Sequence, residues 1–409
     1  MYKSISACRI CGNDNLVKVL ELGEQTLTGV FPKSMHTPIT SGPLTLVKCV
    51  GENKCGLLQL AHSYSLEEMY GENYGYRSGL NPSMVAHLKA KVERIKRLGI
   101  IEKQDIIVDI GSNDATTLKQ YGIDNCIIVG IDPTASKFKQ FYTSNIELIP
   151  GFFSSSSYMD KYGGRKAKVV TSFSMFYDLE DPLAFMREVA EILDSNGVWV
   201  FEQSYMPLML STNSYDTVCH EHLEYYSLAQ ILWMAERVGL KVVDVELNEV
   251  NGGSFSVTAQ KLSGHLSISP SVQQIVDSER AQGLDDLNTY VKFEKSVRES
   301  KQTLLKFLKD AKLAGKTVAA LGASTKGNVI LQYCGIDSSM IASVGEINPD
   351  KFGACTPGTH IPIVNEAELI ASKPDYVLVL PWHFRKFFES QIRYAGLQLV
   401  YPLPTLSLA

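Results

Sequence analysis

Two histidines flank a glutamate in the segment His220-Glu221-His222, which we expect to follow a strand and its exit loop. An imidazole is well suited to proton abstraction near neutral pH, and a neighbouring carboxylate can orient it and stabilise its charged form. The spacing differs from the H-E-x-x-H pattern of helical metalloproteases. The segment therefore predicts a catalytic base, although loop histidines without a catalytic role would show the same pattern.

A second motif is the run Asp-Ile-Gly-Ser-Asn-Asp over residues 109–114, which follows an apolar stretch. A second apolar stretch, Val129-Gly130-Ile131, comes later in the chain and ends in Asp132. We therefore expect a strand, a Gly turn, a helix and a second strand that ends in an acid, the order of a mononucleotide-binding half-unit. Gly111 lets the backbone approach a ligand closely, and Asp132 can accept hydrogen bonds from two ribose hydroxyls. The turn lacks G-x-G-x-x-G, so S-adenosylmethionine is favoured over NAD. An ordinary α/β turn without a ligand is the alternative.

Four of the eight cysteines lie in the first 55 residues. Cys8 and Cys11 have the spacing at which two thiolates ligate one tetrahedral ion, and Cys49 and Cys55 are separated by a loop that can bulge outward. We predict a structural zinc ion on these cysteines, with two buried cysteine pairs as the alternative. A closed four-thiolate site has no open position for catalysis.

Two loops carry further polar groups. In residues 73–79, Tyr74, Tyr76 and Arg77 lie between glycines, and a tyrosine there could donate a hydrogen bond to a carbonyl or enolate oxygen. In residues 322–328, small residues expose backbone N–H groups at a predicted helix start, and Lys326 adds a charge that suits a diphosphate. An interdomain linker and a tight strand–helix turn are the respective alternatives.

A chain of 409 residues is too long to fold around a single hydrophobic core, so we expect these motifs to be distributed over more than one domain. Residues 1–75 are rich in turns and predict a small zinc-binding domain. Residues 76–269 predict an α/β domain whose parallel sheet ends in an antiparallel hairpin at Asn251-Gly252-Gly253. Its predicted helices cover residues 82–98, 182–193 and 228–238, and its strands cover 106–110, 127–132, 168–173, 198–203, 240–247 and 254–260. Residues 270–409 predict a helical arm and a smaller Rossmann-like unit.

The amino-acid composition favours a soluble globular protein over a membrane or nucleic-acid-binding protein. Hydrophobic residues make up 45% and charged residues 20%, as in soluble globular proteins. A net charge of −5 argues against nucleic-acid binding. No apolar run reaches the roughly 20 residues that span a bilayer, and the N-terminus lacks a secretory apolar segment. We expect a cytoplasmic monomer without membrane or nucleic-acid partners.

Together, these features resemble the three-domain sugar C-methyltransferases that act on nucleotide-linked 4-keto-deoxysugars. The resemblance covers nearly the whole chain and rests on the order of its motifs, which are CRICG (8–12), CGLLQL (55–60), YGYRSG (74–79), DIGSND (109–114), HEHLEYYS (220–227), NGGS (251–254), LGASTKGN (321–328) and PGTHIPI (357–363). It implies an N-terminal zinc-binding domain, a central S-adenosylmethionine domain and a C-terminal Rossmann-like domain.

The resemblance also implies roles for residues. The cofactor site would include Asp109, Gly111, Asn113, Asp132 and either Phe152 or Phe153. His222 would be the base, with Glu221, His220 and Tyr76 as its catalytic neighbours. The nucleotide-diphosphate sugar would contact Tyr74, Arg77, Tyr177, Lys326 and Asn328.

The implied reaction is C-methylation beside the C4 ketone, with C3 favoured, through an enolate that His222 generates. The nucleotide, dTDP or GDP, is left open. The wide second cysteine pair, Cys219 where some members have tyrosine, and Tyr177 where many have histidine depart from the family pattern. Alternatives are a sugar O- or N-methyltransferase, a keto-sugar epimerase and a non-catalytic nucleotide-binding scaffold.

Overall fold

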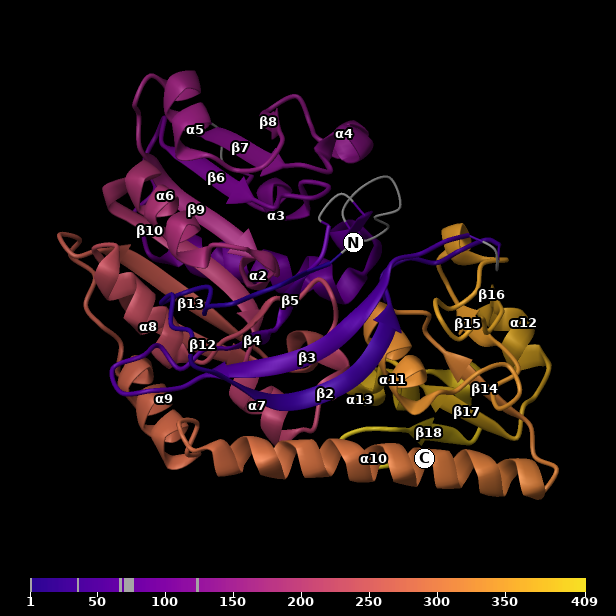
Figure 1. Cartoon of the computed structure of the whole chain (residues 1–409). Helices are drawn as coiled ribbons and strands as arrows, with labels where there is room; N and C mark the ends of the chain where they lie inside the picture. Colours follow the sequence, from indigo (N-terminus) through magenta and orange to yellow (C-terminus); the bar gives the residue numbers. More distant parts are fainter. Residues whose placement is uncertain (1, 35–36, 66–67, 70–76, 123–124) are drawn as a thin grey trace.

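The computed structural model describes residues 2–34, 37–65, 68–69, 77–122 and 125–409. Its described residues form sheets of two, four, seven and six strands (Figure 1). The four-stranded sheet belongs mainly to the N-terminal part but takes one strand, residues 224–225, from between two strands of the seven-stranded sheet. The two larger sheets alternate with helices, so the predicted α/β class with a cysteine-rich N-terminal part is confirmed.

The four-stranded sheet is antiparallel and has the order β11-β4-β3-β2. Its strands are β2 (Leu16–Thr26), β3 (Ser41–Cys49), β4 (Leu58–Leu60) and β11 (Glu224–Tyr225), and a separate pair joins β1 (Lys3–Ser4) to β5 (His62–Ser63). The turn-rich interpretation of this region missed the long β2–β3 hairpin. Two register shifts interrupt the hairpin, and they break the alternation of inward and outward side chains that marks a strand in sequence.

The seven-stranded sheet has the order β12-β13-β10-β9-β6-β7-β8. Its strands are β6 (Ile106–Ile110), β7 (Ile127–Asp132), β8 (Ile146–Pro150), β9 (Ala167–Phe173), β10 (Leu193–Ser204), β12 (Leu240–Asn248) and β13 (Ser254–Lys261). Strands β6 to β10 are parallel, and β13 runs antiparallel to both of its neighbours. The predicted parallel sheet with a terminal antiparallel hairpin is therefore confirmed. The edge strand β8 was not predicted.

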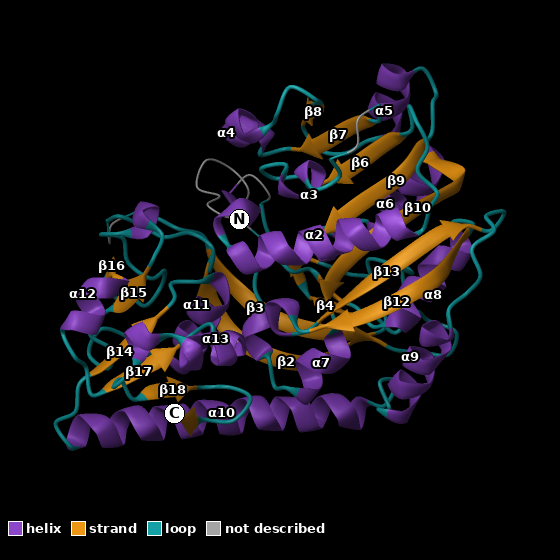
Figure 2. Ribbon diagram, turned by 180° about the vertical axis from the view of Figure 1, so that it is seen from behind, coloured by secondary structure: helices purple, strands orange, loops and turns teal. Residues whose placement is uncertain are grey.

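Helices flank this sheet, and they are α2 (Pro82–Arg97), α3 (Thr116–Lys119), α4 (Ala135–Phe138), α5 (Ser155–Tyr162), α6 (Pro182–Ile192), α7 (Met206–Ser211) and α8 (Leu228–Arg237). α2 starts where the Asn81 side chain accepts a hydrogen bond from the Ser83 N–H, and it lies across one side of the sheet (Figure 2). His87 and Lys91 of α2 both contact Glu202 of β10, at 2.5 and 2.9 Å. These buried contacts fasten the helix to the sheet.

The C-terminal sheet has the order β16-β15-β14-β17-β18-β19 and is parallel except for β19. Its strands are β14 (Val318–Leu321), β15 (Val344–Glu346), β16 (Ile363–Asn365), β17 (Tyr376–Val379), β18 (Leu399–Tyr401) and β19 (Ser407–Leu408). The helices of this part are α9 (Pro270–Ala281), α10 (Leu287–Leu313), α11 (Thr325–Cys334), α12 (Glu366–Ala371) and α13 (Arg385–Ser390).

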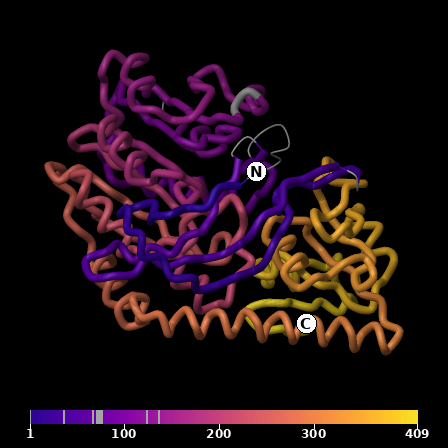
Figure 3. The backbone as a smooth tube through the Cα atoms, viewed as in Figure 1, coloured from indigo at the N-terminus to yellow at the C-terminus, as the bar shows by residue number. Residues whose placement is uncertain are grey.

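Helix α10 runs along one side of the molecule, beneath the hairpin and the C-terminal sheet (Figure 3). Leu304 and Leu308 of α10 belong to one hydrophobic core with Leu20 of β2 and Leu46 of β3. That core continues into the C-terminal sheet, so the N-terminal hairpin is packed against the last part of the chain. Among the described residues, no helix combines the length and apolar character needed to cross a bilayer.

Each parallel sheet has a point where the strand order reverses, beside β6 in one and beside β14 in the other. Open α/β sheets bind ligands outside the carboxyl ends of the strands at such points. The loops after β6 and β14 are the predicted cofactor turn and the predicted anion-binding turn.

Candidate active site

The loop after β6 follows an unusual backbone path. Gly111, Asn113 and Ala115 all adopt positive φ angles, of 75°, 48° and 61°. A Cβ atom at Gly111 would lie 3.2 Å from Cγ of Met175, so glycine also allows the neighbouring loop to approach. The predicted ligand turn is therefore closely packed against the loop that follows β9.

Asp132, at the end of β7, joins the two cofactor-side loops. Its Oδ2 accepts a hydrogen bond from the Asn113 N–H at 2.8 Å, and its Oδ1 accepts from the N–H and the hydroxyl of Thr134 at 2.6 Å each. A carboxylate offers about four acceptor positions, so about one is left for a ribose hydroxyl rather than the two that the sequence suggested.

Three other predicted cofactor residues lie along the same edge of the sheet. Asp109 is buried, and the Thr171 hydroxyl donates to its Oδ1 at 2.5 Å. Burial raises the pKa of the Asp109 carboxyl to about 7. Phe153 packs on Phe185 with ring centroids 5.4 Å apart, whereas Phe152 is 66% exposed. Of the two phenylalanines, Phe152 has the free ring face.

The loop after β9 connects the cofactor turn to the His-Glu-His segment. It carries Met175, which faces Gly111, and Tyr177 in the short helix η3 (Phe176–Asp178). The Tyr177 ring contacts the His222 ring edge to face at 4.4 Å between centroids. The Tyr177 carbonyl accepts the Leu223 N–H at 2.8 Å. One short loop thus places His222 beside the predicted cofactor edge.

His222 is half-buried and has a defined tautomer. Its Nδ1 lies 2.9 Å from the carbonyl oxygen of Thr217, in the short helix η4 (Tyr215–Thr217). A carbonyl can only accept, so Nδ1 carries the proton and Nε2 of the neutral ring has the free lone pair. Burial, followed by the nearby Lys326 ammonium, lowers the pKa of His222 to about 4. The ring is neutral near pH 7.

The other two residues of the segment have different surroundings. Glu221 lies against Gly29, where a Cβ atom would overlap its Oε1, and near Thr325 at the start of α11. Burial raises the pKa of the Glu221 carboxyl. His220 is fully buried behind the segment, with Nε2 3.2 Å from the Gln25 carbonyl and its ring edge-to-face with Tyr64. We assign His220 a packing role.

The C-terminal domain contributes a cation to this site. Lys326 donates to the Asn251 carbonyl at 2.5 Å, in the hairpin turn η5 (Val250–Gly252). Asp216 accepts a hydrogen bond from the Trp382 indole at 2.9 Å, and its carboxylate and the Lys326 ammonium influence each other's pKa. Burial lowers the pKa of Lys326, and Asp216 partly offsets this effect. The central and C-terminal domains therefore meet around Lys326.

The remaining predicted substrate residues are not all brought together. Asn328 is fully buried and donates to the Thr28 carbonyl at 2.7 Å, which fits a structural bridge better than a ligand contact. Arg77 stacks over Phe141 and pairs with Asp114 at 3.5 Å, beside the cofactor turn. Tyr74 and Tyr76 lie outside the described residues.

Sequence reasoning missed His383, which follows β17 in the short helix η7 (Trp382–Phe384). Its Cβ lies 3.6 Å from the Cβ position of Gly252, and burial and Lys326 lower its pKa well below the ordinary value. The buried Asp216, which accepts from the Trp382 indole, was missed as well. A polar residue directly after a parallel strand at the strand-order reversal was the available signal for His383.

The four N-terminal cysteines converge, as predicted. Their sulfur atoms all lie within 4.8 Å of one another, with Cys8 to Cys55 at 3.4 Å and Cys11 to Cys49 at 3.6 Å. Tetrahedral zinc with bonds of about 2.3 Å to sulfur places its ligands about 3.8 Å apart, so the cluster fits one ion. Asn13 donates to the Cys49 sulfur at 3.2 Å, a supporting contact typical of such sites.

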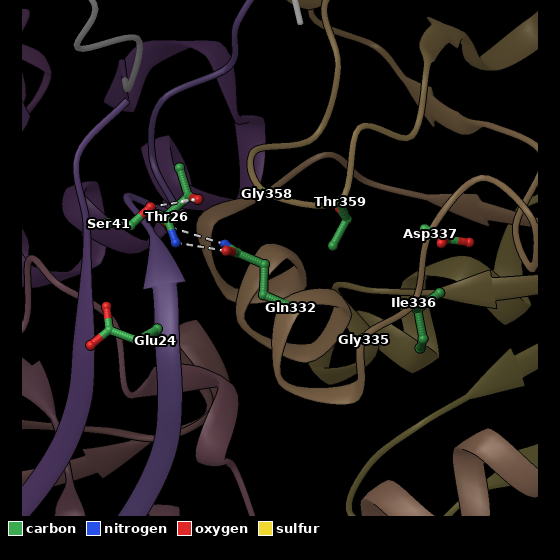
Figure 4. A pocket seen from close by; sticks show the side chains of 9 residues that line it. All are labelled: Glu24, Thr26, Ser41, Gln332, Gly335, Ile336, Asp337, Gly358 and Thr359. Carbon is green, nitrogen blue, oxygen red and sulfur yellow. Dashed lines mark hydrogen bonds between the residues drawn. The ribbon is translucent and has the colours of Figure 1, made fainter. Parts of the chain in front are cut away.

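A separate, open pocket of about 320 Å³ lies between β2 and the end of α11 (Figure 4). The Gln332 side chain crosses to β2, accepting from the Thr26 N–H at 2.7 Å and donating to its carbonyl at 3.0 Å. None of the predicted site residues lines this pocket. It marks a second junction between the N-terminal hairpin and the C-terminal domain.

Comparison with known families matches this organisation. A zinc binding domain model matches residues 8–70, a methyltransferase domain model matches residues 84–245, and the C-methyltransferase C-terminal domain model matches residues 249–404. The chain is a zinc-binding, three-domain C-methyltransferase. This C-methyltransferase uses S-adenosylmethionine and holds zinc on its cysteine cluster. A non-catalytic scaffold is excluded.

A curated relative of the C-methyltransferase is NovU of Streptomyces niveus, described as a C-methyltransferase. It is 28% identical over 413 residues, which cover 99% of this chain and 97% of NovU. Solved structures are more distant. An O-methyltransferase family protein from Burkholderia thailandensis is 14% identical, with a TM-score of 0.36 over 48% of this chain and 63% of its own. Magnesium protoporphyrin IX methyltransferase from Synechocystis PCC 6803 is 11% identical, with a TM-score of 0.34 over 44% and 88%.

Proposed function

We propose that this C-methyltransferase acts on a nucleotide-diphosphate 4-keto-deoxysugar and methylates the carbon next to the ketone, C3, after His222 has removed its proton. A saturated sugar carbon is a poor nucleophile, and the adjacent ketone makes its hydrogen acidic enough for a positioned base. The reaction therefore needs a neutral imidazole, a group that steadies the enolate oxygen, and a site for an anionic nucleotide.

The single observation that carries this proposal is the tautomer of His222. Its Nδ1–H is committed to the Thr217 carbonyl, so the free lone pair of Nε2 is available as a base. The Tyr177 ring holds the other face of the imidazole at 4.4 Å between centroids. A ring fixed from two sides can present one nitrogen to the substrate repeatedly without reorientation.

Lys326 supports an anionic substrate. Its ammonium is half-buried, and it lowers the pKa of His222 in the free protein. A diphosphate bound beside Lys326 would neutralise that field, so the basicity of His222 would rise when the substrate arrives. Proton abstraction would then be favoured in the complex, where it is needed, over the empty site.

The cofactor would lie over the turn after β6. Asp109, Gly111, Asn113 and Asp132 would hold it, with Phe152 offering an aromatic face to its adenine. When bound, S-adenosylmethionine supplies an electrophilic methyl group. Tyr76 would donate a hydrogen bond to the enolate oxygen. Removing one such donor costs on the order of 100-fold in rate.

The test is a mass-spectrometric screen of nucleotide 4-keto-6-deoxysugars with isotope-labelled cofactor. We expect one substrate to gain one labelled methyl on carbon. A methyl gained on oxygen or nitrogen, or no product with any keto-sugar, would overturn the proposal. The paired measurement is solvent deuterium exchange at the carbon beside the ketone without cofactor, which should occur in the wild type and stop in His222→Ala.

A further inference from the structure

Arg9 lies between two zinc ligands, Cys8 and Cys11, yet its side chain points away from the metal cluster into the protein. The guanidinium is 3% exposed. It donates to the carbonyls of Leu60 and His62 at 2.6 and 3.1 Å and to the Ser63 hydroxyl at 2.8 Å. The zinc knuckle therefore fixes a buried cation against the strand β4 and the residues that follow it.

A buried carboxyl group faces that cation. Glu224 is the first residue of β11, two positions after His222, and its side chain has no exposed surface. Its Oε1 lies 3.7 Å from Arg9 Nε, and neither of its oxygens has a well-formed hydrogen bond among the described residues. Burial raises the pKa of the Glu224 carboxyl well above its ordinary value, the Arg9 guanidinium lowers it, and the acidic Asp178 and Glu180 raise it further. Arg9 is therefore the neighbour that favours the charged form of Glu224, and the exposed Glu180 lies 3.8 Å from the same Nε. Glu224 takes no part in the proposed proton transfer.

This pair is connected to His222 by the backbone. Glu224 of β11 pairs with Gln59 of β4, and the Leu60 N–H donates to the Leu223 carbonyl at 2.9 Å. On the opposite side, the Leu223 N–H donates to the carbonyl of Tyr177, whose ring contacts His222. A shift of Glu224 would therefore move the residue next to His222.

The cost of a buried charge explains why this arrangement would matter. A buried acid without its cation must move toward water or take up a proton, because removing one partner of a buried pair leaves the other uncompensated. Either response would loosen β11 against β4. Displacements of about 1 Å from productive geometry can cost on the order of 100-fold in rate.

We propose that Arg9 is a positioning residue for His222, and that the zinc knuckle acts on catalysis by holding this guanidinium against Glu224. Zinc would then do more than stabilise the N-terminal part, because the metal-bound loop would set the geometry of the base. The activity readout of this inference rests on the proposed function, whereas its spectroscopic readout does not.

The experiment is a double-mutant cycle on the full-length, zinc-loaded protein with Arg9→Met, Glu224→Gln and the combined variant. In Arg9→Met we expect a fall in kcat on the order of tenfold or more, with cofactor affinity and zinc content unchanged. Adding Glu224→Gln removes the uncompensated acid, so the combined variant should recover most of the lost rate. Recovery of activity by the second mutation would show that Arg9 acts through Glu224, because general damage to the fold would not be reversed by a second substitution.

The second readout is the NMR titration of His222 in histidine-labelled, substrate-free protein, with its signal assigned by His222→Ala. Arg9→Met should shift this signal and its titration midpoint, and the combined variant should bring both back toward the wild type. If no keto-sugar is turned over by the wild type, the proposed function fails while this comparison still decides the inference.

Two results would overturn the inference. One is an unchanged His222 titration and unchanged kcat in Arg9→Met. The other is strictly additive damage in the combined variant. If Arg9→Met alone loses zinc or unfolds, the combined variant decides: a folded, zinc-loaded protein with the wild-type His222 signal supports the pairing, and continued loss shows that Arg9 only holds the knuckle together.

Discussion

The imidazole Nδ1 of His222 lies 2.9 Å from the carbonyl oxygen of Thr217, and this contact fixes which ring nitrogen keeps a free lone pair. Thr217 belongs to η4, whose Asp216 binds Trp382 of the C-terminal domain. The orientation of the proposed base is therefore linked to the position of a neighbouring domain.

Replacing His222 by alanine should remove methyl transfer while S-adenosylmethionine still binds. A positioned general base contributes about 10²- to 10⁴-fold to the rate, so kcat should fall by at least the lower figure. Isothermal titration with the cofactor and a labelled-methyl assay measure the two properties. The exposed His265 provides the matched control, His265→Ala, which should keep both. Near-normal turnover by His222→Ala would remove it as the base.

Replacing Lys326 by methionine should raise the pKa of His222, because the Lys326 ammonium disfavours the protonated ring. The base must be unprotonated to act, so activity is lost as the pH falls through its pKa. In the wild type the acid limb of kcat/KM should lie near pH 4, and in the variant it should move to higher pH. The exposed Lys292→Met is the control. An unmoved limb would mean that Lys326 does not act on His222.

Replacing Cys8 by serine should abolish zinc binding and lower the thermal midpoint, since structural zinc contributes directly to folding free energy. Metal analysis should give one zinc ion per chain in the wild type and almost none in the variant. Cys126 lies outside the cluster, so Cys126→Ser should retain the ion. A full complement of zinc in Cys8→Ser would contradict the four-sulfur site.

Replacing Phe152 by alanine should weaken cofactor binding without lowering stability. The ring is 66% exposed, so truncation removes little packing. An aromatic stacking contact is worth about 0.5–1.5 kcal/mol, which corresponds to roughly a 2- to 13-fold increase in the cofactor Kd. Calorimetry measures the change. Phe387→Ala, at a 48% exposed ring on α13, should leave the Kd unaltered.

Replacing Trp382 by phenylalanine should lower the free energy of unfolding by about 1–3 kcal/mol, because the buried Asp216 loses its hydrogen-bond donor. Urea denaturation measures this loss. The half-buried Trp233 on α8 gives the comparison, Trp233→Phe, which should cost less. Equal costs for the two would argue against a stabilising contact between the domains.

The sequence predicted local features well. Apolar runs located the central strands, Asn251-Gly252-Gly253 located the hairpin, and cysteine spacing located the metal cluster, because each signal lies within a few neighbouring residues. The contact between Tyr177 and His222 had no such signal, since it depends on where two loops emerge from the folded sheet. His383 follows a predicted strand, but its neighbours Gly252 and Lys326 come from distant parts of the chain, so its place in the site emerges only on folding.

Residues that are close in sequence and have similar predicted roles can have different surroundings, and only the folded chain shows this difference. His220 and His222 look equivalent in sequence, but residues 220–221 form a turn in which the His222 N–H donates to the Cys219 carbonyl at 3.2 Å, so the two rings leave the backbone in different directions. One ring is packed against Tyr64 and the other against Tyr177. Asn328 likewise looked like part of an anion-binding turn, but it lies on the buried face of α11.

The pairing of β4 with β11 has a consequence for synthesis on the ribosome. β4 emerges early, but its partner β11 follows the five parallel strands β6 to β10 in the chain, so the open edge of β4 must wait until those strands have been made. The nascent N-terminal segment would be a natural client for chaperones, and an excised fragment ending before residue 77 should aggregate where the full-length chain does not.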